Sequence, residues 1–129
     1  MFKDAPAFSS FSVGDIGRAR EFYGQTLGLP VAEAFGLLKI KLAGGQEIEI
    51  YPKPDHAPAS FTVLNFQVPD INQAVSALSA AGVEIETYDL PELKTGDNGI
   101  LVDEKMQLKA AWFKDPSGNI LSVIEGEMT

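Results

Sequence analysis

The chain reads Val13-Gly14-Asp15-Ile16 near its start and Val68-Pro69-Asp70-Ile71 at its middle. In both places an apolar-alternating run comes before the Asp, and a helical stretch closed by a Gly comes after it. The closing segments are Leu27-Gly28-Leu29 and Ala81-Gly82-Val83. A repeat of this length indicates one supersecondary unit used twice, each copy burying what the other cannot bury alone.

Length and composition limit the classes to which the protein can belong. The 129 residues suffice for one compact domain or two closely packed half-domains, and the start Met1-Phe2-Lys3-Asp4 lacks a signal-peptide pattern. No apolar run is long enough to cross a bilayer, so we expect a cytoplasmic protein without a membrane partner. The lack of cysteine excludes disulfides, thiolate zinc sites and cysteine nucleophiles, and the net charge of −8 argues against nucleic acid.

Each half is predicted to contain a strand, a helix and then three strands. In the first half, alternation predicts a strand over Ala7–Val13, and Asp15 caps a helix near Asp15–Leu27. Two later strands are placed at Leu37–Leu42 and Glu47–Tyr51. Their alternation sets the lysines and glutamates on one face and the apolar residues on the other.

The second half is predicted to follow the same order. A strand over Phe61–Val68 precedes a helix near Asp70–Ala81, and a short strand follows near Val83–Tyr88. The long stretch Asp89–Gln107 is rich in turn formers and charge, and we expect a mobile lid at the mouth of a cavity there.

A hairpin ends this half. It joins Leu108–Lys114 to Asn119–Glu125 through a turn at Asp115-Pro116-Ser117-Gly118, which suits a type I turn with a glycine bulge. That register sets Trp112 opposite Ser122. The two modules are therefore placed at about residues 6–52 and 61–126 of a single domain over 1–129, with the proline-rich linker 52–60 between them.

The residues also resemble a known family. Val13-Gly14-Asp15, Arg20-Glu21-Phe22-Tyr23, Leu27-Gly28-Leu29 and the terminal Trp112-Phe113-x-Asp115-Pro116-x-Gly118-Asn119 are similar to motifs of the vicinal oxygen chelate superfamily. That superfamily includes glyoxalases, extradiol dioxygenases, bleomycin-binding resistance proteins and fosfomycin-modifying enzymes. The resemblance implies an α+β fold of two βαβββ modules in pseudo-twofold repeat, forming a cupped, barrel-like mixed sheet around a ligand cavity. It is less specific for activity, because this fold hosts many chemistries.

In metal-using members the ligands come from the first and last strands of each module. By motif position these sites fall here on Phe8, Glu49, Val63 and Ser122, and the internal repeat relates Phe8 to Val63 and Glu49 to Ser122. A divalent ion needs imidazole or carboxylate ligands from several directions. One carboxylate is not enough, so we expect no metal and no cofactor, although the four positions should still converge.

Glu49 is the sharpest catalytic candidate. One interpretation makes it a general base placed between Phe8 and Val63. The favoured interpretation is structural, with Glu49 paired to Lys39 or Lys41 on the adjacent strand. The only histidine, His56, lies in the linker and is interpreted as a solvated residue.

The leading hypothesis is a metal-independent protein that binds an aromatic or amphipathic small molecule in the cavity between the modules. An acidic protein would favour a cationic ligand. The residues expected to line that cavity are Phe8, Ser10, Glu49, Tyr51, Val63, Asn65, Trp112 and Ser122. One alternative is a metal-free lyase or isomerase that uses Glu49 as its base, and another is a non-catalytic, dimeric interaction protein. A homodimer is plausible in each case, because such modules leave sheet edges to cover.

Overall fold

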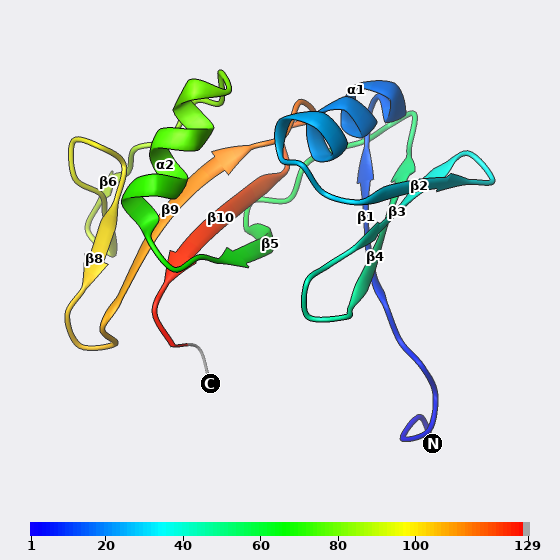
Figure 1. Cartoon of the computed structure of the whole chain (residues 1–129), viewed down its shortest axis with the longest axis horizontal. Coiled ribbons are helices and arrows are strands. Elements are labelled where there is room, and N and C mark those ends of the chain that lie inside the picture. Colours follow the sequence, from blue (N-terminus) through cyan, green and yellow to red (C-terminus); the bar gives the residue numbers. More distant parts are fainter. Residues whose placement is uncertain (128–129) are drawn as a thin grey trace. The chain divides into compact units, whose positions relative to one another are not determined.

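A computed structural model describes residues 1–127 and confirms the α+β class (Figure 1). The chain divides into two compact units, unit 1 over Met1–Pro58 and unit 2 from Ala59 onward, each with its own four-stranded sheet. No helix within residues 1–127 is both long and apolar enough to span a membrane.

Unit 1 has the predicted order of strand, helix and three strands. Its sheet runs β1-β4-β3-β2, with β1 parallel to β4 and the other pairs antiparallel. The elements are β1 (Ser9–Val13), α1 (Ile16–Glu21), the π-helical turn η1 (Phe22–Thr26), β2 (Val31–Ala34), β3 (Leu37–Lys41) and β4 (Glu47–Pro52). The sequence pattern had placed β3 and β4 but not β2.

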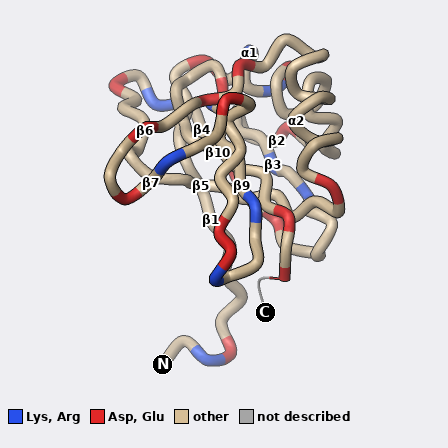
Figure 2. Tube along the Cα trace, turned by 90° about the vertical axis from the view of Figure 1, so that its left-hand side faces the viewer, with Lys and Arg blue, Asp and Glu red and all other residues tan. Residues whose placement is uncertain are grey.

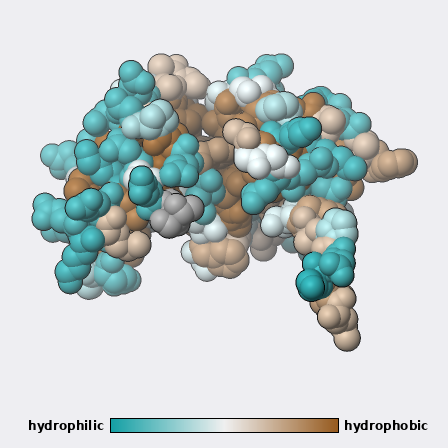
Figure 3. Space-filling view, turned by 60° about the horizontal axis from the view of Figure 1, so that its bottom comes forward, coloured by the Kyte–Doolittle hydropathy of each residue, from teal (hydrophilic) through white to brown (hydrophobic). Residues whose placement is uncertain are grey.

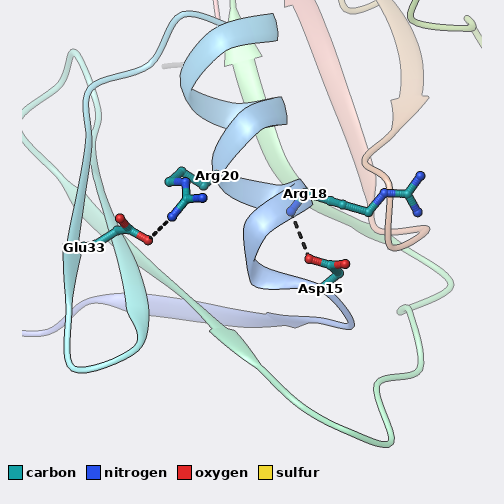
Figure 4. Close-up of polar contacts among 4 residues, drawn as sticks. All are labelled: Asp15, Arg18, Arg20 and Glu33. Carbon is teal, nitrogen blue, oxygen red and sulfur yellow. Dashed lines mark hydrogen bonds and ion pairs between the residues drawn. The ribbon is translucent and has the colours of Figure 1, made fainter.

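The first helix begins where the sequence predicts it. The Asp15 carboxylate accepts a hydrogen bond of 3.0 Å from the Arg18 backbone N–H, as an N-cap does (Figure 4). Its second half widens into η1, because the Leu27 N–H donates to the carbonyl of Phe22, five residues back. Arg20 then joins the helix to β2 through an ion pair of 2.6 Å with Glu33 (Figure 4).

The sheet of unit 1 has one apolar and one charged face, as predicted. Leu38, Ile40, Ile48 and Ile50 are buried on the side of α1, where the rings of β1 and η1 also meet. The other face pairs lysines of β3 with glutamates of β4. Because side chains alternate along a strand, one backbone serves both a core and a polar surface.

Unit 2 repeats this plan with an insertion. Its sheet runs β5-β10-β9-β8, with β5 parallel to β10, and α2 packs against β9 and β10 (Figure 1). Asp70 caps α2 by accepting from the N–H groups of Asn72 and Gln73, as predicted. The elements are β5 (Thr62–Gln67), α2 (Ile71–Ala80), β6 (Asp89–Leu90), β7 (Leu93–Lys94), β8 (Leu101–Asp103), β9 (Leu108–Lys114) and β10 (Ile120–Glu125).

Two sequence-based assignments in unit 2 need correction. The strand expected near Val83–Tyr88 is reduced to one bridge between Ile85 and Phe113, and the strand that follows the helix in the four-stranded sheet is instead β8. The stretch Asp89–Gln107 is not irregular throughout, because it contains the β6–β7 hairpin and β8. Gly99 (φ 82°) permits this arrangement, since a Cβ there would lie 2.5 Å from Ile85 Cγ2.

The surface of each unit carries both charged and apolar residues. Acidic and basic residues are interspersed along the trace (Figure 2). Figure 3 shows hydrophilic and hydrophobic residues side by side on the face that it presents. The exposed large apolar residues of the described chain include Phe2, Phe8, Phe35, Phe61 and Met106.

Candidate ligand-binding faces

The two modules place equivalent residues in equivalent rows across their sheets. In unit 1 Glu49 lies between Ser10 of β1 and Lys39 of β3. In unit 2 Ser122 lies between Asn65 of β5 and Trp112 of β9. The two rows lie on the sheet faces opposite α1 and α2. The repeat in the sequence is therefore also a repeat in strand register, with a charged row in one unit and an aromatic row in the other.

Glu49 forms the strand-to-strand ion pair that the sequence favoured. Its Oε1 lies 3.8 Å from Lys39 Nζ, and its side chain is 22% exposed. An ion pair of this kind contributes at most about 1 kcal/mol to stability. The geometry gives Glu49 a structural partner within unit 1 and leaves its role as a base a hypothesis.

His56 was interpreted as solvated, and the structure corrects this. It is half-buried, and its Nδ1 lies 2.6 Å from the Ser12 hydroxyl. The linker brings it there through a turn in which the His56 N–H donates to the Lys53 carbonyl at 3.0 Å. Tyr51, the strand neighbour of Ser12, is exposed on the same face. Spacing alone could not show that the linker turns back onto the sheet.

Phe8 lies just before β1 and is 65% exposed. Together with its neighbours it lines a shallow, open groove beside residues 45–48, which form the start of β4 and the turn before it. The groove is confined to unit 1. The Phe8 ring is exposed in this groove, and the groove does not enclose the ring.

Trp112 dominates the polar face of unit 2. Its indole Nε1–H donates a hydrogen bond of 3.1 Å to the Thr62 hydroxyl. Thr62 belongs to β5 and Trp112 to β9, and these strands lie on either side of β10. The indole must therefore lie across β10.

Ser122 lies under this part of the face. It is fully buried, and its hydroxyl is 2.5 Å from Asn65 Oδ1. Ser122 therefore lies beneath the surface of this face. The exposed Asn65 and the half-buried Trp112 form the accessible part of the face.

Val63 does not take the place that the repeat suggests. The register between β5 and β10 shifts, so that Ile120 pairs with Thr62 and Leu121 pairs with Leu64. Val63 is the extra residue of this bulge, and Thr62 contacts Trp112 instead. An irregularity of one residue in a strand pairing leaves no clear sign in a sequence.

Three further residues of this face were missed. The Tyr88 ring contacts the Trp112 indole at a centroid distance of 5.7 Å and an interplanar angle of 82°. Glu86 and Lys114 form an ion pair of 3.2 Å beside it. Burial raises the pKa of the Tyr88 hydroxyl above its ordinary value of 10.0, the Glu86 carboxylate raises this pKa further, and Lys114 opposes both. The alternation Glu86-Thr87-Tyr88 was the available signal.

The donor set does not fit a metal ion. Of the four positions carried over from metal-using relatives, two are the apolar Phe8 and Val63. Ser122 is committed to Asn65, and Glu49 is paired with Lys39. Within the described residues no group of three or more His, Asp or Glu side chains is placed to hold a metal. The convergence of the four positions stays a prediction.

Residues 8–123 match the Glyoxalase/Bleomycin resistance protein/Dioxygenase superfamily. This match covers most of the chain, and the folds of the two units agree with it. The chain therefore belongs to this superfamily, as the motifs indicated. No curated protein matches it.

Solved structures share the fold at low sequence identity. A glyoxalase family protein from Enterococcus faecalis is 24% identical, with a TM-score of 0.71 over 97% of this chain and 100% of that one. The fosfomycin resistance protein FosX from Listeria monocytogenes is 12% identical, with a TM-score of 0.73 over 97% and 95%. TnmS3, an antibiotic binding protein from Streptomyces sp. CB03234, is 20% identical, with a TM-score of 0.63 over 96% and 98%.

Proposed function

We propose that this protein binds a small aromatic or amphipathic organic molecule, without a metal, on the sheet face of unit 2 that carries Trp112. We name this surface the Trp112 face; it consists of Thr62, Asn65, Glu86, Tyr88, Trp112 and Lys114. The observation that carries the proposal is the indole held across β10 by its hydrogen bond to Thr62.

A ring held in this way suits a binding surface. Its N–H is satisfied by Thr62, so burying it under a ligand leaves no donor unpaired. Trp112 is half-buried, so part of this large apolar ring stays accessible, and the exposed Asn65 amide provides a polar group on the same face. Small-molecule sites typically combine mostly apolar walls with a few orienting polar groups.

The superfamily also supports the proposal in general terms. Its description includes bleomycin resistance proteins, and one neighbour in fold is described as an antibiotic binding protein. These descriptions concern those proteins. For this chain they make a binding role without catalysis a reasonable expectation.

Trp112 also makes the proposal testable, because it is the only tryptophan in the chain. Intrinsic fluorescence therefore reports on this face alone. After treatment with a chelator, the protein is titrated with a panel of amphipathic aromatic compounds. We expect saturable changes in Trp112 emission, with binding confirmed by calorimetry.

A matched variant sharpens this test. Trp112→Leu should abolish the calorimetric signal for the compounds found, while Phe35→Leu, which alters an exposed aromatic ring of unit 1, should leave it unchanged. The proposal fails if binding survives in Trp112→Leu, or if it appears only after metal is added back.

A further inference from the structure

We infer that the ligand of the Trp112 face is an organic cation, an alkylated ammonium group attached to an apolar body. The cation would lie in the corner between the Trp112 and Tyr88 rings, beside the Glu86 carboxylate. This inference rests on the proposed function and specifies the chemical class of the ligand.

The corner follows from the two rings. The indole lies across the sheet, and the Tyr88 ring stands at 82° to it. The planes of the two rings therefore meet at nearly a right angle and form the corner. Tyr88 is held in position because its N–H donates to the Thr95 hydroxyl at 2.8 Å and its carbonyl accepts from the Thr95 N–H at 2.9 Å.

Two such rings attract cations. The face of an aromatic ring is electron-rich, and tryptophan and tyrosine are the strongest cation–π partners among side chains. Alkylated ammonium groups are weakly hydrated, so moving them onto a ring surface costs little compared with a small inorganic ion. Perpendicular rings suit a rounded head group better than a flat one.

The charged residues around the corner also favour a cationic ligand. Glu86 pairs with Lys114 at 3.2 Å, but its side chain is only 26% exposed, whereas that of Lys114 is half exposed. The carboxylate is thus the more enclosed of the two charges, and the Lys114 ammonium is the group that a bound cation would displace. An incoming cation would take its place beside Glu86. An anion would meet both the Glu86 carboxylate and the electron-rich ring faces.

The test compares three ligands with one phenylpropyl body and different heads: trimethylammonium, hydroxyl and carboxylate. Trp112 fluorescence and calorimetry measure the affinity of each. We expect the ammonium compound to bind at least about tenfold more tightly than the alcohol, and the carboxylate to bind least tightly.

Variants then assign the preference to this corner. Glu86→Gln should reduce the preference for ammonium over alcohol by about tenfold and change alcohol binding by no more than about twofold. Glu84→Gln removes the same charge from an exposed residue that lines a different groove, formed with α2, and should leave the preference intact.

The outcomes separate this inference from the proposed function. If the alcohol binds as tightly as the ammonium compound, or if the carboxylate binds best, the cation inference is overturned and the proposed function stands. A preference that survives in Glu86→Gln also overturns it. If none of the three compounds changes Trp112 emission or releases heat, both are contradicted.

Discussion

The Trp112 indole donates a hydrogen bond to the Thr62 hydroxyl at 3.1 Å, although β10 lies between their strands. This contact makes the indole a bridge over β10 and holds the ring on this face of the sheet. Both the proposed binding role and the inferred cation corner depend on it.

Removing the acceptor of this bond should weaken both the fold and the site. Thr62→Val keeps the branched shape and leaves the half-buried indole N–H without its partner. We expect the free energy of unfolding to fall by about 1 kcal/mol and ligand affinity to fall several-fold. Chemical denaturation and calorimetry measure these changes. Thr87→Val, at an exposed threonine, is the control, and equal effects from the two variants would refute the bridge.

The raised pKa of Tyr88 predicts that the stability of the protein depends on pH. Its pKa is raised by burial and by Glu86, so the folded state keeps the phenol protonated at pH values where the unfolded chain has lost that proton. The unfolded state therefore binds fewer protons, and the free energy of unfolding should fall as the pH rises above about 10.

The measurement is denaturation between pH 8 and about pH 11, comparing wild type with Tyr88→Phe. The variant should lose less stability over that interval, because its ring cannot ionise. Identical slopes for the two proteins would show that Tyr88 titrates normally.

The turn between β2 and β3 is predicted to be strained. Phe35 has a φ of 55°, a left-handed conformation that bulky residues rarely adopt, and its ring is fully exposed. With Gly36 at φ 78° it forms a two-residue hairpin turn of the kind that favours Asn-Gly. Phe35→Asn should raise the free energy of unfolding by about 1 kcal/mol. A destabilised variant would mean that the ring packs against something in solution, such as a second copy.

Replacing Glu49 distinguishes a binding protein from an enzyme. If it only pairs with Lys39, Glu49→Gln should change stability by less than about 1 kcal/mol and leave the affinity for a neutral ligand unchanged. If it is a general base, the same change should preserve binding and reduce turnover of any substrate found by about a hundredfold. Lys39→Met, which removes the partner instead, shows how much of either effect comes from the ion pair.

The sequence predicted the architecture because its signals are local or periodic. Asp15 and Asp70 cap their helices as their side-chain chemistry dictates, and the hairpin turn sets Trp112 opposite Ser122. The alternation along β3 and β4 correctly assigned Lys39 and Glu49 to one face. Each of these inferences needs only neighbours within a few residues or across one turn.

The site was predicted less well because it depends on longer-range relationships. Because of the bulge at Val63, Thr62 contacts Trp112 in place of Val63. Only the three-dimensional pairing of β5 with β10 reveals this. Tyr88 contacts Trp112 although the two residues lie far apart in the sequence. His56 reaches Ser12 because the linker turns back on itself. None of these contacts has a periodic signature.

We propose that a small organic molecule binds the Trp112 face without a metal. The most direct measurement is a ¹H–¹⁵N NMR titration of the chelator-treated protein with the tightest compound of the panel. We expect saturating shifts of the single indole N–H resonance and of the amides around Asn65 and Tyr88. Saturating shifts confined to the amides around Ser10, Glu49 and His56, with the indole resonance unmoved, would contradict it.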